Sequence, residues 1–344
     1  MTQLTILNDV HIGAQRASGT TPLTAWQLRQ YLIKSFKELV DGVEGDLLIL
    51  GDLFDTGNIP MADVLATWEI LRAWLERGQK CYLVLGNHDR TRTLTTLSSF
   101  QFLCRLLTAQ FPGQVQEIDD PVYLKEHDAY VVSSSPNQDL FNAALAAVPK
   151  CTYLMVHCNF NNNFAVESDH SLNMSVEQAA VAPVKHIIFA HEHQAKTAIN
   201  GKVYIAGNQF PSSISDCLGN DAKYMTVLTN AGIQKIETWN RKGNYAEQDW
   251  RSLSDDGSKF IRVVGDAVAT EAADVVSAIA KFRNKSKALV ITNAVKVEGA
   301  SDGEQVQITL EQVKSFDVLS ALLECLDERE QGVVKALLSS KETA

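Results

Sequence analysis

The chain has little that would hold it together covalently or anchor it in a membrane. Its six cysteines are scattered through 344 residues without a Cys-x-x-Cys pair, which favours reduced, packed thiols over structural zinc or disulfides. No stretch reaches the roughly 18 uninterrupted apolar residues of a membrane span. The N-terminus enters a strand-like run directly, without the basic region and cleavage site of a secretory signal. We therefore expect a cytoplasmic protein that has no membrane partner.

Basic residues are also in short supply. Lys and Arg number 31 against 41 Asp and Glu, so the formal net charge is −10. This balance argues against a surface that binds polyanions everywhere, because that affinity needs clustered cations. Any contact with nucleic acid must be local, or helped by metals or a partner. Apolar residues at 45% and charged residues at 21% are ordinary for a globular protein of this length.

What the chain does contain is a repeated arrangement in which a short apolar run is followed by a polar motif. The motifs are DVH at 9–11, GDLFD at 51–55, GNHD at 86–89, VHCN at 156–159 and AHEH at 190–193. Each apolar run has the length of a strand rather than of a helix. If these runs are buried strands of a mostly parallel sheet, the Asp, Asn and His side chains that follow them converge on one crevice at the carboxyl edge.

Segments with helical spacing alternate with these strands, which predicts an α/β fold. The helices are expected at 26–40, 64–75, 98–107 and 138–148, and later strands at 203–206, 224–229 and 233–239. The polar stretch 240–256 breaks the periodicity, so we place the end of a first domain, 1–240, there. A strand-helix-strand unit at 258–300 predicts a small second domain. An amphipathic stripe at 316–326 predicts a helical segment within 314–344.

The motifs together offer seven oxygen and nitrogen donors, which is as many as two divalent ions require. These donors are Asp9, His11, Asp52, Asn87, His157, His191 and His193. Alternation along an extended chain would place Asp9 and His11 on one side, and likewise His191 and His193. Asp52 is the natural bridging carboxylate. Mixed imidazole and carboxylate ligands suit manganese, iron or zinc better than magnesium.

In this order, D-x-H, GD-x-x-D, GNHD, a later His and a final H-x-H resemble the calcineurin-like metallophosphoesterase superfamily, over roughly residues 1 to 210. The resemblance implies a layered β-sandwich flanked by helices. It also implies that Asp9, His11, Asp52 and His193 hold one ion, and that Asp52, Asn87, His157 and His191 hold the other. His88 would contact the scissile phosphate, with Asp55 orienting it. Ala190 departs from the Gly of most members, which would strain the backbone if a positive φ were needed there.

The residues after the second Asp of the GD motif bear on the substrate. Protein Ser/Thr phosphatases of the superfamily carry Arg-Gly there, whereas this chain has Thr56-Gly57. GDLFDTG, and the stretch 205–216, instead resemble SbcD-type DNA double-strand-break repair nucleases, particularly the phage recombination exonuclease subunits.

That resemblance implies a manganese-dependent 3′ to 5′ exonuclease with endonuclease activity, acting in DNA recombination and repair in a bacterial or phage-infected bacterial cell. It further implies a homodimer in which residues 258–300 form a DNA-capping domain. The C-terminal helix would bind an SbcC-type coiled-coil ATPase.

Several alternatives stay open at this stage. The enzyme could instead hydrolyse nucleotides or other small phosphoesters, or the chain could be a binding subunit without catalysis. The C-terminal stripe could pack on its own domain. The densest basic run could contact DNA phosphates from the cap, or could simply be cations at the negative end of a helix dipole. That run comprises Lys281, Arg283, Lys285 and Lys287.

Overall fold

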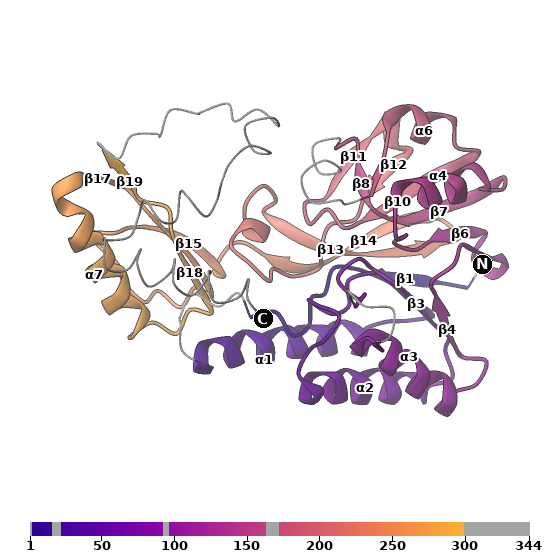
Figure 1. The fold of residues 1–344 in the computed structure, drawn as a ribbon, viewed down its shortest axis with the longest axis horizontal. Coiled ribbons are helices and arrows are strands. Elements are labelled where there is room, and N and C mark those ends of the chain that lie inside the picture. Colours follow the sequence, from indigo (N-terminus) through magenta and orange to yellow (C-terminus); the bar gives the residue numbers. More distant parts are fainter. Residues whose placement is uncertain (1, 16–21, 92–95, 163–171, 299–344) are drawn as a thin grey trace, which may run out of the picture. The chain divides into compact units, whose positions relative to one another are not determined.

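Two six-stranded sheets contain most of the strands of the described residues (Figure 1). The computed structural model describes residues 2–15, 22–91, 96–162 and 172–298. Each sheet has a parallel centre and an antiparallel strand toward at least one edge. Within each sheet, most strands therefore run in the same direction. Mixed α/β architecture was predicted from the sequence, and the structure confirms it.

The first sheet has the order β14-β13-β1-β2-β3-β4. Its strands are β1 (Leu4–Leu7), β2 (Asp46–Leu50), β3 (Cys81–Val84), β4 (Val115–Ile118), β13 (Ala222–Thr229) and β14 (Gly232–Asn240). Strands β1 to β4 are parallel, and the β13–β14 hairpin joins β1 in antiparallel register. The second and third polar motifs therefore follow neighbouring strands, with the first motif beside them.

The second sheet has the order β11-β12-β10-β7-β6-β5. Its strands are β5 (Val122–Leu124), β6 (Ala129–Val132), β7 (Cys151–His157), β10 (Val184–Ala190), β11 (Lys196–Ala198) and β12 (Val203–Ile205). The last two polar motifs follow β7 and β10. The motifs converge on one place, as the sequence had suggested, but the expectation that their strands share one sheet was wrong. The five motifs come from two sheets, because either face of a fully apolar strand can be covered by a second sheet.

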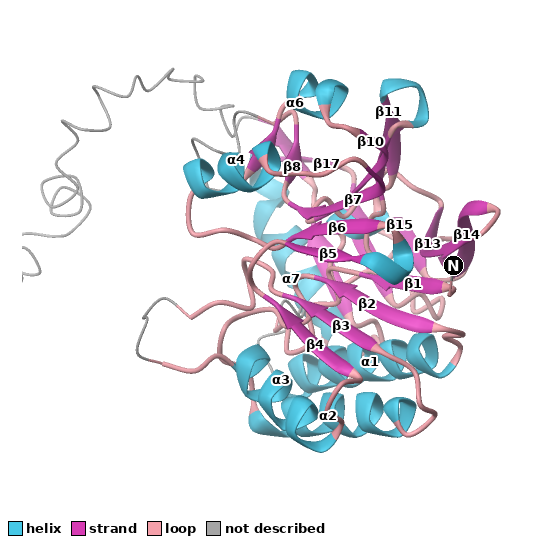
Figure 2. Cartoon of the chain, turned by 90° about the vertical axis from the view of Figure 1, so that its right-hand side faces the viewer, coloured by secondary structure: helices cyan, strands magenta, loops and turns pink. Residues whose placement is uncertain are grey.

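Helices cover the outer faces of the sandwich (Figure 2). α1 (Pro22–Asp41), α2 (Met61–Leu75) and α3 (Ser99–Gln110) lie beside the first sheet, and α4 (Gln138–Ala146) and α6 (Val176–Val181) beside the second. Alternation along β2 divides its side chains between two cores. Leu48 and Leu50 pack against the other sheet, whereas Leu47 and Ile49 pack under the helices.

A smaller three-stranded parallel sheet follows the sandwich. It has the order β15-β16-β18, made of β15 (Tyr245–Asp249), β16 (Phe260–Val264) and β18 (Val290–Asn293). α7 (Ala272–Arg283) packs on it through Val275 and Ile279. The structure therefore has a strand, β15, inside the segment that was expected to be a linker. As an edge strand with alternating exposure, β15 can be polar, which hid it from a search for apolar runs.

The remaining elements are short. They are β8 (Asn159–Phe160), β9 (Asn173–Met174), β17 (Asp266–Val268), β19 (Lys296–Glu298) and the 3-10 turns η1 (Lys125–His127), η2 (Ile199–Gly201), η3 (Ser215–Cys217) and η4 (Ala269–Glu271). Within the described ranges, no helix combines the length and apolar character needed to cross a membrane. The amphipathic segment predicted within 314–344 lies outside the described residues.

Candidate metal centre

The loops after β1 and β2 run side by side and present the first polar residues of the site. The backbone N–H of Asp9 donates to the carbonyl of Gly51 at 3.2 Å, and that of His11 donates to the carbonyl of Asp52 at 3.1 Å. His157, at the end of β7, links the second sheet to the first, because its Nδ1 donates to the Leu50 carbonyl at 2.9 Å. The exits of strands from both sheets thus meet at one place.

The backbone at this junction is unusual. Asp9, His11, Asp52 and His191 have positive φ angles of 50°, 52°, 52° and 87°. Asp9 and His11 therefore do not alternate along an extended chain as the sequence had suggested. Non-glycine residues in this region are uncommon and cluster at functional sites. The positive φ falls on His191 rather than on Ala190, which lies within β10, so alanine there needs no such strain.

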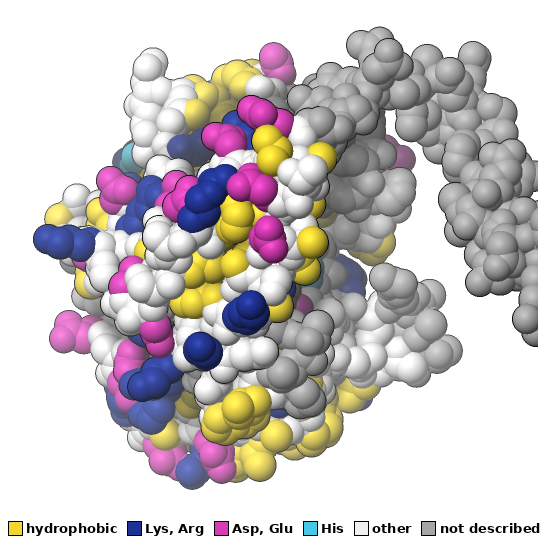
Figure 3. Space-filling view, turned by 90° about the vertical axis from the view of Figure 1, so that its left-hand side faces the viewer, with side chains coloured by type: hydrophobic (Ala, Val, Ile, Leu, Met, Phe, Trp, Pro, Cys, Tyr) yellow, Lys and Arg dark blue, Asp and Glu magenta, His cyan; other side chains and the backbone are white. Residues whose placement is uncertain are grey.

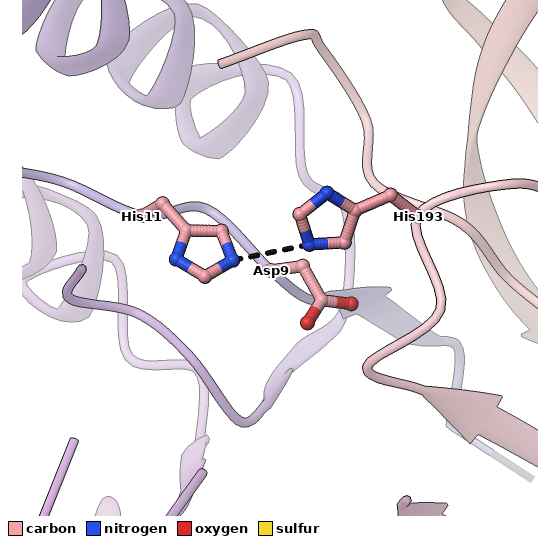
Figure 4. A group of neighbouring side chains, drawn as sticks. All are labelled: Asp9, His11 and His193. Carbon is pink, nitrogen blue, oxygen red and sulfur yellow. Dashed lines mark hydrogen bonds between the residues drawn. The ribbon is translucent and has the colours of Figure 1, made fainter. Parts of the chain in front are cut away.

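Six of the seven predicted donors, together with His88, form three overlapping groups. Within each group the potential ligand atoms lie within 4.8 Å of one another. One group is Asp9, His11 and His193, a second is Asp52, His157 and His191, and a third is His11, Asp52 and His88. In the first group the Nε2 atoms of His11 and His193 are 3.1 Å apart, and the two rings point toward each other with Asp9 beside them (Figure 4). His191 and His193 therefore belong to different groups, although only one residue separates them.

The Asp9 carboxylate has one oxygen that is satisfied and one that is not. Oδ2 accepts from the Asn8 side-chain amide at 2.6 Å and from the His191 backbone N–H at 3.0 Å. Oδ1 is buried and has no hydrogen-bond partner. A buried carboxylate oxygen without a partner is costly unless a cation faces it. This orphaned oxygen, together with the imidazoles beside it, fits a bound divalent ion.

Asp52 occupies the position between the groups. Its Oδ1 accepts from the His88 backbone N–H at 2.9 Å, and its Oδ2 lies 3.2 Å from Nε2 of His157. Burial would raise the pKa of Asp52, but the nearby histidines, His157 foremost, lower it overall. Burial would likewise lower the pKa of His157, but the Asp52 carboxylate raises it to about 10. Asp52 is thus an ionised, fully buried carboxylate placed to be shared.

Asn87 joins the second group through its side-chain oxygen. Oδ1 lies 3.0 Å from His157 Nε2 and 3.1 Å from His191 Nδ1. Asp9, His11, Asp52 and His157 are each about 1% exposed, whereas Asn87 is exposed and His88, His191 and His193 are partly so. The site therefore has a buried floor and an accessible rim, from which a substrate could approach.

His88 is held by the main chain of the GD motif. Its Nδ1 donates to the backbone carbonyl of Asp55 at 2.7 Å. The sequence had assigned the orienting role to the Asp55 carboxylate, but that carboxylate instead lies 3.4 Å from Nδ1 of His11. Because a carbonyl only accepts, Nδ1 of His88 carries the hydrogen and Nε2 is left for a substrate.

Several residues that support the site were not predicted. Asp89 accepts from the backbone N–H groups of Phe54 and Gly86 at 2.9 and 3.0 Å, and so ties the GD and GNHD motifs together. Burial, and then the charge of Asp52, raise its pKa to about 7. A Cβ on Gly86 would lie 2.1 Å from Oδ1 of Asp52, so this glycine permits the close approach. The GNHD motif contains both residues, which was the available signal.

Asp216 and the Asn8–Gln209 pair were also missed. Asp216 Oδ1 accepts from Nδ1 of His193 at 2.7 Å. Asn8 and Gln209 exchange hydrogen bonds of 2.9 and 3.0 Å next to Asp9. Burial would raise the pKa of Asp216, but the hydrogen bond from His193 lowers it overall. The available signals were that Asn8 directly precedes the first motif and that Gln209 and Asp216 lie in the stretch 205–216, whose resemblance to the nucleases was noted, but no spacing rule assigned these residues to the site.

The basic run is not part of these groups and is at the end of α7. Lys281 and Arg283 fall in the last turn of the helix, where cations favour its dipole. Arg283 donates to the Ile291 carbonyl at 3.1 Å, so it joins the end of α7 to β18. Lys281, Lys285 and Lys287 are exposed. On the side of the molecule drawn in Figure 3, Lys and Arg are interspersed with Asp and Glu rather than gathered in one basic field.

The model of one protein family matches more than half of the chain. The model of the calcineurin-like phosphoesterase family matches residues 2–195, which include every residue of the three groups described above and Asn87. Among curated proteins, the DNA double-strand break repair protein Mre11 of Aeropyrum pernix is 33% identical over 97 residues, covering 26% of this chain and 22% of that protein. The chain thus matches only about a fifth of the length of this relative.

Among solved structures, the TT1561 protein of Thermus thermophilus is 10% identical, with 69% of this chain and 99% of that chain covered and a TM-score of 0.39. A novel archaeal phosphodiesterase is also 10% identical, with coverage of 68% and 99% and a TM-score of 0.34. At these TM-scores the similarities do not bear on function.

Proposed function

Because the chain belongs to the calcineurin-like phosphoesterase family, we propose that it is a dinuclear-metal-dependent DNA nuclease. The family hydrolyses phosphoesters with two divalent ions, so the chain is a metal-dependent phosphoester hydrolase. The finer statement, that its substrate is DNA, is the proposal. Its support is the stretch of 97 residues that is similar to Mre11, and Thr56 at the position where protein phosphatases of the superfamily carry Arg.

In this proposal Asp9, His11, Asp52 and His193 hold one ion, and Asp52, Asn87, His157 and His191 hold the other. The grouping of their donor atoms and the orphaned oxygen of Asp9 support this assignment. We expect manganese, which the resemblance to SbcD-type nucleases implies; the mixed imidazole and carboxylate set itself suits manganese, iron or zinc better than magnesium. When bound, the two ions would neutralise the phosphodiester and make a water molecule acidic enough to attack it.

The observation that most supports the proposal is the position of His88 beside these donor groups. Its ring lies edge-on to that of His11, with centroids 4.9 Å apart, and its Nδ1–H is committed to the Asp55 carbonyl. Nε2 would therefore contact the scissile phosphate and, when protonated, donate to the leaving oxygen. No side chain has to become covalently attached to the substrate.

The proposed DNA contact outside the metal centre involves three exposed lysines of the small domain, Lys281, Lys285 and Lys287. Arg283 belongs to the same run, but its bond to Ile291 gives it a structural role as well. We also propose that the chain acts as a homodimer in recombination and repair, as a 3′ to 5′ exonuclease with endonuclease activity. Residues 314–344 would bind an SbcC-type ATPase.

The test compares substrates at fixed manganese concentration. We expect digestion of end-labelled linear duplex DNA, and weaker cleavage of closed circular DNA, with and without a candidate ATPase. His88→Leu should keep both ions and lose cleavage by about two to four orders of magnitude, as expected for loss of a general acid. His186→Leu is the matched control, because His186 stacks on Tyr153 away from the donor groups.

Three results would count against the proposal. Hydrolysis of a small chromogenic diester without any cleavage of linear duplex would favour a phosphodiesterase for nucleotides or other small phosphoesters. Retained cleavage in metal-loaded His88→Leu protein would remove the role assigned to His88. Manganese binding without hydrolysis of any phosphoester would indicate a binding subunit.

A further inference from the structure

Asp216 is a buried carboxylate that is fully occupied by hydrogen bonds. It lies in η3, and its side chain is 2% exposed. Oδ2 accepts from the backbone N–H groups of Ser212 and Ser213 at 2.8 and 3.0 Å, and from the Ser212 hydroxyl at 3.0 Å. Oδ1 accepts from Nδ1 of His193 at 2.7 Å. The carboxylate is therefore fixed on one side by a turn and directed on the other side at one ring.

This contact decides the tautomer of His193. An ionised carboxylate only accepts, so Nδ1 of His193 carries a hydrogen and Nε2 can present a lone pair. Nε2 lies 3.1 Å from Nε2 of His11, on the side where Asp9 also lies (Figure 4). Asp216 thus holds the ring in the only tautomer that can bind a cation through Nε2.

The two donor groups differ in the oxygen atoms that lie near Nδ1 of their histidines. In the Asp9 group, His193 has the Asp216 carboxylate at 2.7 Å, and His11 has the Asp55 carboxylate at 3.4 Å, which is longer than a hydrogen bond of good geometry. In the other group, His157 has the neutral carbonyl of Leu50 at 2.9 Å. A carboxylate behind an imidazole raises its basicity and adds negative charge near the ion, whereas a carbonyl does so less.

We propose that Asp216 is a positioning residue that makes the ion position formed by Asp9, His11 and His193 the first of the two to fill. This inference rests on the proposed dinuclear metal centre. It adds an order of loading to that centre, and it gives a role to a residue that follows the last metal motif by 23 positions. Removal of a group that accepts a hydrogen bond from a metal-ligating histidine lowers metal affinity by about 10- to 100-fold.

The backbone around His193 has anchors other than Asp216, so removal of the carboxylate should affect the ring more than the loop. Lys223 Nζ donates to the His193 carbonyl at 3.3 Å, and the Ala195 N–H donates to the Asn220 side chain at 2.9 Å. Asp216→Ala is therefore an informative variant. Asp216→Asn is the milder second variant, because it keeps the shape and loses the charge. Asp221→Asn is the matched control, since Asp221 is 94% exposed and lies five residues away.

The experiment is a titration of metal-stripped full-length protein with manganese alone. Calorimetry gives the two affinities, and the electron paramagnetic resonance spectrum distinguishes one isolated ion from a coupled pair. For the unchanged protein we expect a tighter first step with the signal of an isolated ion. His157→Ala should keep that tight step, whereas His11→Ala should lose it. Asp216→Ala should weaken the first step by about 10- to 100-fold and change the second less, with Asp216→Asn between.

The outcomes separate this inference from the proposed function. If the unchanged protein binds two ions, but Asp216→Ala that is folded by circular dichroism leaves the first step unchanged or weakens both steps equally, the inference is overturned and the metal centre stands. Two steps of equal affinity in the unchanged protein would overturn it as well. If Asp216→Ala does not fold, Asp216→Asn decides by the same criteria. If no divalent ion binds at all, the proposed function fails first.

Discussion

Gly51 adopts a backbone conformation that favours glycine, in a place where another residue already fills the space for a side chain. Its φ is +82°, and a Cβ there would lie 2.2 Å from Nδ1 of His157. Gly78 has nearly the same φ, +88°, but no atom within 4 Å of its Cβ position. The two glycines therefore differ in the surrounding space and not in the backbone.

For Gly78→Ala we expect a loss of about 1–2 kcal/mol in unfolding free energy, which is the cost of a left-handed alanine. Gly51→Ala should lose that amount and a further ~1–3 kcal/mol, because the methyl group must displace the buried imidazole and break its bond to Leu50. Urea unfolding of the metal-stripped variants measures this difference in unfolding free energy. The free energy should fall with urea concentration at the same slope in both variants. Manganese stoichiometry is the second readout, and only Gly51→Ala should lower it.

Equal losses of stability in the two alanine variants would refute this reasoning. So would a normal stoichiometry of two ions in Gly51→Ala, since the displaced ring is one of the proposed ligands. Either result would mean that His157 is free to move away from Gly51 without cost.

Two further predictions concern regions away from the metal centre. Burial would raise the pKa of Asp46, but the contact with His127 at 3.1 Å and the hydrogen bond from the Lys80 N–H lower it overall. The ionised Asp46 therefore stabilises the fold at pH values above its unfolded pKa. This stabilisation disappears as the pH falls through its folded pKa. Asp46→Asn should therefore cost about 1–3 kcal/mol at neutral pH and progressively less below about pH 4, as measured by urea unfolding across pH; a constant difference would contradict this. Deletion of residues 315–344 should abolish copurification with the ATPase and leave manganese-dependent cleavage, whereas loss of folding would show that this segment packs on its own chain.

Much of the fold could be predicted because each strand and its polar end are adjacent in sequence. The apolar run at 47–50 lies within β2, and the helix expected at 64–75 lies within α2. The start of α1 was placed four residues late, although Pro22 at the first helical position is a known start signal. Local periodicity and turn chemistry were sufficient for these elements.

The division into two sheets could not be predicted in the same way. Along β2, Leu48 faces the opposite sheet and Ile49 faces the helices, yet the residue types are alike. A run that is apolar on both faces gives the same pattern whether a sheet or a helix covers it. The contact of His157 with Leu50 across the two sheets is therefore a property of the tertiary structure. The same limit applies to Asp216, which no short motif connects to His193.

At this site the left-handed backbone conformation and the metal chemistry favour the same types of residue. Each non-glycine residue in that conformation costs on the order of 1–3 kcal/mol, and Asp and His are among the types that adopt it most readily. Asp9, His11, Asp52 and His191 are all of these types. The hydrogen bonds from Asp9 to Gly51 and from His11 to Asp52 hold two of the strained loops against each other. Residues suited to binding a divalent ion are thus also suited to the backbone that brings them together, so the loops can present these side chains already in place.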